Sequence, residues 1–371
     1  MSTLDAEFLI VGAGPAGATL AAALAERGRE VVALDRDTFP RNKVCGEFLS
    51  PEVEDCLRRL GCLERFHELS PSTMTRARLT SASGRTLHLD LPATAYGLTR
   101  RSLDAFLVDE ARHRGAVVRE GVDVRSLEKV NGGVRATWPG GQLRASRVIL
   151  AHGRRSRLDR RLNRPYFSRR SPYVAFKQHF RLRDDASDAL PSLRHTVELH
   201  IFEGGYCGVS FAEDQIVNVC TMLHEDLVKG REIWDVLGRG AAPLAHRLRS
   251  LRPVDDELLA IAQIPLALKE RGRDGLLFVG DAASMIAPLA GDGQAMAIES
   301  ALSLASLLLS SRDDDLESLW RRRWRRRYEA RIRLGRLLQE AMIRPAVTEP
   351  ALIALNHMPR VTDALVRLTR G

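Results

Sequence analysis

The glycine-rich stretch Gly12-Ala13-Gly14-Pro15-Ala16-Gly17 has the residue types and spacing that point most directly to chemistry. Gly12 allows a tight turn, Gly14 leaves room for a pyrophosphate, and Gly17 lets the next helix pack close to a sheet. The N-terminus of that helix offers backbone N–H groups to a diphosphate. Further on, Asp35 can accept the ribose hydroxyls of an adenosine, and it would repel a 2′-phosphate. The stretch therefore predicts an adenine dinucleotide site that does not take NADP.

Two strands and one helix must position these residues. Residues 6–11 form an apolar run of strand length, and residues 18–27 form an Ala-rich helix that Gly28 closes. A second apolar strand, residues 31–34, ends in Asp35. A strand, a glycine-rich turn, a helix and a second strand with a terminal acid are the context that the dinucleotide fingerprint requires.

A second and a third segment favour FAD over NAD. Residues 275–281 read as an apolar strand that ends in Gly280-Asp281, where a carboxylate can accept hydrogen bonds from ribityl hydroxyls. Residues 288–298 contain another glycine-rich turn that opens a helix. The N–H groups of that helix can face the pyrimidine edge of a flavin, where negative charge collects on reduction.

With these motifs the chain resembles the FAD-dependent group A monooxygenases of the para-hydroxybenzoate hydroxylase fold, and among them the geranylgeranyl-reductase-like branch. The Gly-Asp motif matches at Gly280 and Asp281, and an Arg-x-x-Asp helix start matches at Arg101 and Asp104. The loop Phe-Pro-Arg-x-Lys-x-Cys-Gly-Glu of that branch matches at residues 39–47. In the family the arginine of the helix start reaches the pyrophosphate region.

The resemblance implies an α/β fold with a Rossmann-like FAD-binding domain, an inserted antiparallel-sheet substrate domain and C-terminal helices. We expect the FAD-binding domain at 1–75, 99–165 and 271–371, a substrate-domain hairpin at 76–98 and the rest of the substrate domain at 166–270. Further strands are expected at 122–130, 173–182, 195–202, 206–211 and 215–222. The substrate pocket is expected above the flavin, with the inserted sheet as its floor.

The expected cofactors are FAD and, as external reductant, NADH or NADPH. The predicted cofactor-binding residues are Gly12, Gly14, Pro15, Ala16, Gly17, Asp35, Arg36, Lys43, Cys45, Gly46, Arg101, Val124, Gly280, Asp281, Pro288, Gly291, Asp292, Gly293 and Gln294. One family motif departs from its usual form, because His152 stands where the family carries an aspartate implicated in flavin and nicotinamide handling. We therefore expect slow oxidation of NAD(P)H without substrate.

No catalytic residue is identified, but two candidates stand out. His179 lies on an expected strand, on the same face as Lys177, and it could move a proton near neutral pH or serve as a structural histidine. Cys45 lies in the loop expected near the flavin ring, where it could tune the flavin or simply fill a tight loop.

The run from Trp320 to Tyr328 alternates arginines with Trp320, Trp324 and Tyr328 at helical spacing. This pattern favours an aromatic stripe that packs a C-terminal helix onto the FAD domain. The alternative is a helix that lies on an anionic membrane surface.

Composition limits the remaining classes. The chain has 371 residues, a net charge of +9 and five cysteines in no metal-binding spacing. We expect a cytoplasmic protein with no membrane-spanning helix, no metal and no nucleic-acid partner. The sequence does not determine the oligomeric state.

The favoured function is monooxygenation of a bulky apolar aromatic or polyketide-like molecule, as in secondary metabolism. The alternatives are a C=C reductase or dehydrogenase of the geranylgeranyl reductase type and a non-catalytic flavin-binding protein. The Trp-x-Trp-x-Ile-Pro signature of flavin-dependent halogenases is absent.

Overall fold

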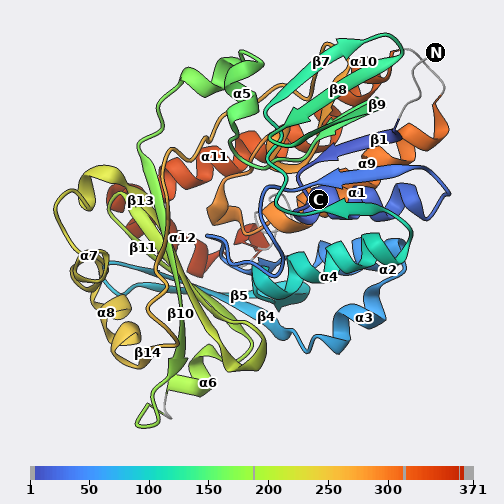
Figure 1. Cartoon of the computed structure of the whole chain (residues 1–371). Coiled ribbons are helices and arrows are strands. Elements are labelled where there is room, and N and C mark those ends of the chain that lie inside the picture. The colour runs from blue at the N-terminus through green and yellow to red at the C-terminus, as the bar shows by residue number, and fades with distance from the viewer. Residues whose placement is uncertain (1–4, 187–188, 312–314, 359, 363–371) are drawn as a thin grey trace.

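The computed structural model describes residues 5–186, 189–311, 315–358 and 360–362, which form two sheets and the helices around them (Figure 1). The first sheet has the order β16-β17-β9-β1-β2-β6, and β8 and β7 extend it from β9. Its strands are β1 (Ala6–Val11), β2 (Val31–Leu34), β6 (Val117–Arg119), β7 (Ser126–Val130), β8 (Gly133–Trp138), β9 (Gly141–Leu150), β16 (Gly272–Arg273) and β17 (Leu276–Phe278).

The inner strands of the first sheet place the predicted cofactor segments together. Strands β17, β9, β1 and β2 pair in parallel. Parallel strands carry their carboxyl ends at one edge of the sheet, which is where doubly wound folds bind ligands. Gly12, Asp35 and the Gly280-Asp281 segment follow three of these strands and so meet at that edge.

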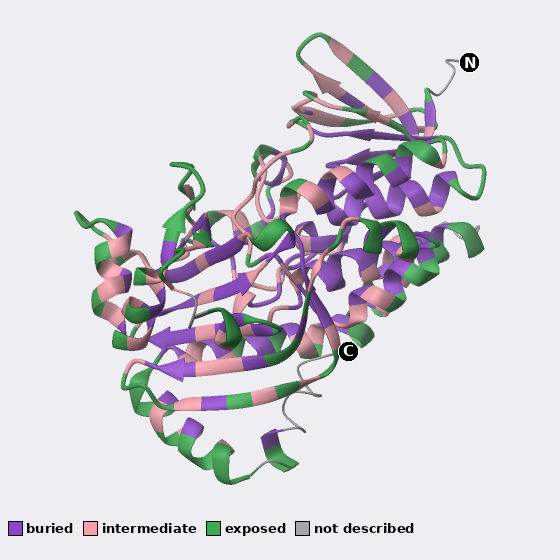
Figure 2. Ribbon diagram, turned by 90° about the horizontal axis from the view of Figure 1, so that it is seen from below, coloured by how far each residue is buried: buried purple, intermediate pink, exposed green. Residues whose placement is uncertain are grey.

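Most helices surround the first sheet, and others pack on the second sheet. They are α1 (Pro15–Ala25), α2 (Glu52–Leu60), α3 (Leu63–Glu68), α4 (Arg100–His113), α5 (Arg157–Arg161), α6 (Ala189–Leu193), α7 (Ile233–Gly240), α8 (Ala242–Arg249), α9 (Gly293–Ser310), α10 (Leu316–Trp324), α11 (Ala330–Met342) and α12 (Pro345–His357). Helix α1 packs against α4 and α9. Figure 2 shows buried residues gathered at the centre of the protein. Helix α1 and strands β1 and β2 are almost wholly buried, whereas β6 and β7 contain no buried residue.

The second sheet has the order β14-β10-β13-β12-β11-β4-β5-β3, with β15 on β10. Its strands are β3 (Phe48–Leu49), β4 (Ser72–Ser81), β5 (Thr86–Gly97), β10 (Tyr173–Leu182), β11 (Thr196–Phe202), β12 (Gly205–Phe211), β13 (Val217–His224), β14 (Leu251–Pro253) and β15 (Leu259–Ile261). All its pairs are antiparallel except β11 with β4. The predicted fold class is therefore confirmed, with one parallel pair in the inserted sheet.

Two strand predictions need correction. The strand expected from residue 122 begins at Ser126, and the residues before it form a loop. The strand expected from residue 215 begins at Val217, because Asp214 and Gln215 have positive φ angles and make the turn before it.

The aromatic run near the C-terminus packs inward. Trp320, Trp324 and Tyr328 are fully buried, and Nε1 of Trp320 donates to the carbonyl oxygen of Phe278 at 2.9 Å. Because these rings fill the core, they do not form a membrane contact, and the packing interpretation is correct.

Helix α9 is the one described helix long and apolar enough, by length and composition, to cross a membrane. It is 61% buried inside the protein and packs against α1 and α2. We therefore describe it as a core helix.

Candidate functional site

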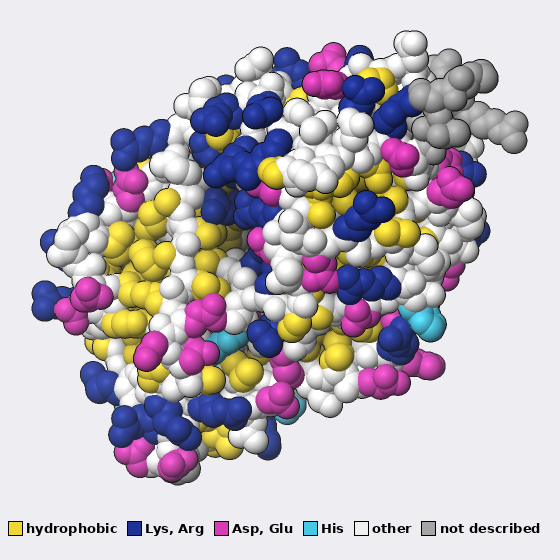
Figure 3. Space-filling view, in the orientation of Figure 1, with side chains coloured by type: hydrophobic (Ala, Val, Ile, Leu, Met, Phe, Trp, Pro, Cys, Tyr) yellow, Lys and Arg dark blue, Asp and Glu magenta, His cyan; other side chains and the backbone are white. Residues whose placement is uncertain are grey.

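A cavity of about 770 Å³ lies between the two sheets. Residues of the glycine-rich turn and the carboxyl ends of β1, β2 and β9 line one end, and leucines of the second sheet line the other. Figure 3 shows the corresponding hollow, with Lys and Arg side chains at its upper end and hydrophobic side chains below them. The cavity thus joins a charged half to an apolar half.

The glycine-rich turn is built for a close approach of a ligand. Gly12 has a φ of 103°, and a Cβ there would meet the backbone of Ala151. A Cβ on Gly17 would collide with the carbonyl oxygen of Gly12, so this glycine lets α1 start tightly behind the turn. Gly14 faces the cavity beside the guanidinium groups of Arg41 and Arg100. The turn therefore presents backbone and cationic groups together, as a pyrophosphate requires.

Asp35 has protein partners at the adenosine end. Its carboxylate accepts hydrogen bonds from the backbone N–H of Ala13 at 2.7 Å and from Nη1 of Arg41 at 2.8 Å. These contacts fix the carboxylate at the edge of the cavity, where further oxygen lone pairs can take ribose hydroxyls.

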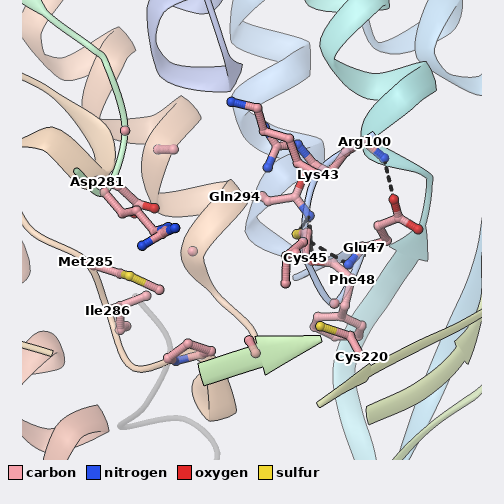
Figure 4. Close-up of a pocket in the computed structure, with 18 of the residues that line it drawn as sticks. Lys43, Cys45, Glu47, Phe48, Arg100, Cys220, Asp281, Met285, Ile286 and Gln294 are labelled. Carbon is pink, nitrogen blue, oxygen red and sulfur yellow. Dashed lines mark hydrogen bonds between the residues drawn. The ribbon is translucent and has the colours of Figure 1, made fainter. Parts of the chain in front are cut away.

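Asp281 lines the cavity on the side across from Lys43 and Cys45 (Figure 4). Burial raises the pKa of its carboxyl, although the charges of Lys269, Arg100 and Arg154 act in the other direction. Nζ of Lys269 donates to the backbone oxygens of Asp281 at 2.7 Å and Arg154 at 2.6 Å, and burial lowers the pKa of Lys269 to about 7. Lys269 thus fixes the backbone of Asp281 and leaves its carboxyl facing the cavity.

Most of the predicted cofactor residues line the cavity. Those that do are Gly12, Gly14, Pro15, Ala16, Asp35, Arg36, Lys43, Cys45, Gly46, Val124, Asp281, Pro288, Gly291, Gly293 and Gln294. Gly17 and Gly280 lie behind the lining, and a Cβ on Gly280 would meet the side chain of Ala16.

The prediction that Arg101 binds the cofactor needs correction. It is exposed and does not line the cavity, whereas its neighbour Arg100 does. Adjacent residues of a helix point about 100° apart. Arg100 pairs with the buried Asp104 through Nε at 2.7 Å, so Arg100 takes the place we assigned to Arg101.

Asp292, which was also predicted to bind the cofactor, does not line the cavity. It is buried, accepts a hydrogen bond from Oγ of Ser50 at 2.7 Å and pairs with Arg331. Asp292 therefore anchors the start of α9 to neighbouring elements and does not face the cavity.

His152 has a structural partner. Its Nε2 lies 3.1 Å from Oδ1 of Asp159, which also accepts from Nη1 of Arg164 at 2.8 Å. Burial acts to raise the pKa of Asp159, but the hydrogen bond and charge of His152 and the charge of Arg164 outweigh it and lower that pKa. His152 also lines the cavity, so it connects the cavity wall to α5.

Cys45 lies among polar groups at the middle of the cavity. Its Sγ accepts hydrogen bonds from Nε2 of Gln294 at 3.3 Å and from the backbone N–H of Glu47 at 3.4 Å (Figure 4). Burial raises the pKa of the Cys45 thiol, so the group is protonated at neutral pH.

Glu47 is a buried, cavity-lining acid that the sequence analysis did not single out. Its carboxylate accepts hydrogen bonds from the backbone N–H of Arg100 at 2.7 Å and from Nε2 of His179 at 2.7 Å, and it pairs with Nζ of Lys177. Burial acts to raise the pKa of Glu47, but His179 and Lys177 outweigh it and keep that pKa below its usual range. The alternation of Lys177 and His179 on one strand face was visible in the sequence, but their shared partner was not.

The apolar half of the cavity accepts a long hydrophobic molecule. Its lining includes Ala77, Leu79, Leu87, Leu89, Leu91, Val197, Leu199, Ile261, Met285, Met342 and Leu355. These side chains come from the second sheet, from the loop before α9 and from α11 and α12. Such apolar walls are typical of small-molecule sites whose few polar groups fix orientation.

The charged half fits FAD. Nε of Arg41, Oδ1 of Asn42 and Oε1 of Gln294 are buried without a hydrogen-bond partner, and all three residues line the cavity. Buried polar atoms are normally satisfied, so they indicate a polar ligand. Among the residues that the structure describes, no group of His, Cys, Asp and Glu side chains is arranged to hold a metal ion.

A family model described as an FAD-binding domain matches residues 5–315. The chain belongs to this FAD-binding family. It is an FAD-dependent oxidoreductase, and the prediction of FAD is confirmed.

Two curated reductases resemble this flavoprotein over most of its length. Menaquinone reductase of Mycolicibacterium smegmatis is 28% identical, and the match covers 85% of this chain and 79% of that protein. Digeranylgeranylglycerophospholipid reductase 2 of Methanopyrus kandleri is 24% identical over 99% of this chain and 93% of that protein. The structure of the flavin-dependent brominase Bmp2 covers 98% of the flavoprotein and 93% of its own chain, with a TM-score of 0.80 and 17% identity, which shows a shared fold.

Proposed function

We propose that this flavoprotein reduces a carbon–carbon double bond in a long apolar molecule, such as a polyisoprenoid chain or an isoprenoid quinone. The observation that carries the proposal is the position of the Glu47 network. Glu47 lines the cavity in the loop that also carries Cys45, and its partners Lys177 and His179 come from β10 of the second sheet. The two reductases that match most of the chain support the same reaction class.

Reduction of a double bond needs a hydride for one carbon and a proton for the other. Bound FAD, once reduced by NADH or NADPH, supplies the hydride. The proton must come from the chain or through it. His179 is about 13% exposed at its side chain, whereas Glu47 is fully buried and lines the cavity. The pair therefore connects solvent to the cavity, and we assign it the delivery of the proton.

Lys177 and Cys45 have supporting roles in this assignment. Lys177 is buried and pairs with Glu47, so it holds the carboxylate in place and favours its ionised form between turnovers. The Cys45 thiol hydrogen-bonds to the same loop and to Gln294, which fixes the loop against α9.

Replacement of Glu47 tests the proposal. In Glu47→Gln the amide can still accept hydrogen bonds but cannot pass on a proton. We expect unchanged FAD content and an anaerobic reoxidation of the reduced flavin by substrate that is 10²- to 10⁴-fold slower, the usual contribution of general acid catalysis. Glu64→Gln, an exposed site on α3, is the matched control. Equal reoxidation rates in Glu47→Gln and the control would contradict the assignment.

Monooxygenation of a bulky apolar molecule is the second candidate. The apolar half of the cavity favours it as well, because a water-poor enclosure protects oxygen chemistry at a flavin from side reactions. Oxygen uptake that depends on substrate, with one oxygen atom in the product, supports monooxygenation. Turnover without oxygen supports reduction.

A further inference from the structure

Helix α12 presents apolar side chains to solvent as well as to the protein. Its inner face contributes buried Leu352 and the cavity-lining Leu355, and the helix packs on β4, β5 and α11. At 100° per residue its exposed positions fall on one side of the helix, and six of the eight are apolar. They are Pro345, Ala346, Val347, Pro350, Ile353, Ala354, Asn356 and His357.

This exposed face, which we call the α12 face, is part of a local concentration of exposed apolar groups. Of the ten large hydrophobic side chains exposed in the described residues, five lie between residues 337 and 361. Val347 and Ile353 are each 41% exposed, and Met358, just after the helix, is 50% exposed. A helix that is apolar on both sides is normally buried, so the α12 face indicates a partner.

The surrounding charge favours an anionic partner. The one acidic side chain of α12, Glu349, pairs with Arg85 at 3.1 Å. Exposed Arg344 and Arg360 bracket the helix, and the chain as a whole has a net charge of +9. Apolar side chains flanked by arginines are the pattern of a helix that lies in the surface of an anionic bilayer.

The place of α12 in the fold supports the same partner. Met342 and Leu355 line the apolar end of the cavity, so α11 and α12 separate that end from the outside. We propose that the α12 face docks on an anionic lipid bilayer and brings the apolar end of the cavity next to the membrane. A hydrophobic substrate would then pass between membrane and cavity beside α12. The proposal stands whichever reaction the flavin performs.

Sedimentation of the FAD-loaded protein with vesicles tests the proposal. We expect binding to phosphatidylglycerol vesicles that weakens with added salt, and at least tenfold weaker binding to phosphatidylcholine vesicles. The double variant V347D/I353D should lose at least tenfold in binding to phosphatidylglycerol and keep its FAD content. The matched control V117D/V254D places the same charges at apolar residues that are 50% and 44% exposed elsewhere, and it should bind like the unmodified protein.

Three outcomes would overturn the proposal. One is the absence of binding to phosphatidylglycerol vesicles, and another is an equal loss of binding in both double variants. The third is a dimer in the unmodified protein that V347D/I353D dissociates, because the α12 face would then be covered by a second copy. Turnover of a detergent-dispersed substrate should be unchanged in V347D/I353D, which separates failure of docking from failure of the proposed reaction.

Discussion

The carboxylate of Glu47 accepts a hydrogen bond from Nε2 of His179 at 2.7 Å, although 132 positions separate the two residues in the chain. Glu47 adopts a φ of 52°, a region that side chains other than glycine rarely occupy. A glycine would relieve that backbone conformation but would remove the group that joins His179 and Lys177 to the cavity wall. The strained position is thus consistent with a functional demand on the carboxylate.

Replacement of His179 should separate proton delivery from substrate binding. In His179→Gln a hydrogen bond to Glu47 can persist, but the amide cannot take up and pass on a proton. We expect the rate of substrate-dependent flavin reoxidation to fall at least tenfold, with little change in KM. A change in KM alone, with the reoxidation rate at saturating substrate preserved, would assign His179 a structural role.

Asp281 is expected to bind the flavin rather than to stabilise the fold. Asp281→Ala should weaken FAD binding roughly 10- to 100-fold, because hydrogen bonds to a charged group contribute about 1.5–3 kcal/mol. Asp274→Ala, at an exposed acid in the turn between β16 and β17, is the matched control. Titration of the two FAD-free variants with FAD measures the difference. Equal affinities would show that the Asp281 carboxyl does not contact the cofactor.

His152 lines the cavity and contacts Asp159. Replacing His152 with the aspartate that the family carries would therefore also affect Asp159. In His152→Asp a second carboxylate would approach buried Asp159, and we expect a loss of about 1–3 kcal/mol of unfolding free energy. His152→Asn adds no charge and should lose less. Denaturant unfolding compares the two variants. Stopped-flow reduction by NADH in the same samples tests the expectation that the unmodified protein oxidises NAD(P)H slowly without substrate.

Lys269 should make the stability of the FAD-free protein depend on pH. The pKa of Lys269 is about 7 in the folded chain and about 10.5 when unfolded. Between these values the unfolded chain binds more protons, so the free energy of unfolding rises with pH, by at most about 1.4 kcal/mol per pH unit. Lys269→Met lacks this contribution. From pH 7 to 9 the stability difference between the unmodified protein and Lys269→Met should therefore shift in favour of the unmodified protein. The absence of a shift would mean that Lys269 stays charged when folded.

The local motifs of the sequence predicted the charged half of the site well, because each combines a turn, a helix start and a strand that are close in the chain. The sequence could not distinguish Arg100 from Arg101, since one residue of helix phase decides which side chain faces the cavity. The sequence also could not show that Asp292 points away from the cavity, because its partners Ser50 and Arg331 come from distant elements. The Glu47 network was missed because the loop that carries Glu47 and strand β10, which carries Lys177 and His179, meet only in the folded chain. The predicted domain boundaries and the NAD(P)H reductant stay predictions.

Mass spectrometry of the product formed by the reduced flavoprotein, without oxygen, tests the proposed reaction most directly. The enzyme is reduced with dithionite, freed of excess reductant and mixed anaerobically with an isoprenoid quinone or a polyprenyl lipid. We predict reoxidation of the flavin and a product that carries two additional hydrogen atoms across one former double bond. A flavin that stays reduced until oxygen is admitted, followed by a product that carries one oxygen atom, would contradict the proposed reduction.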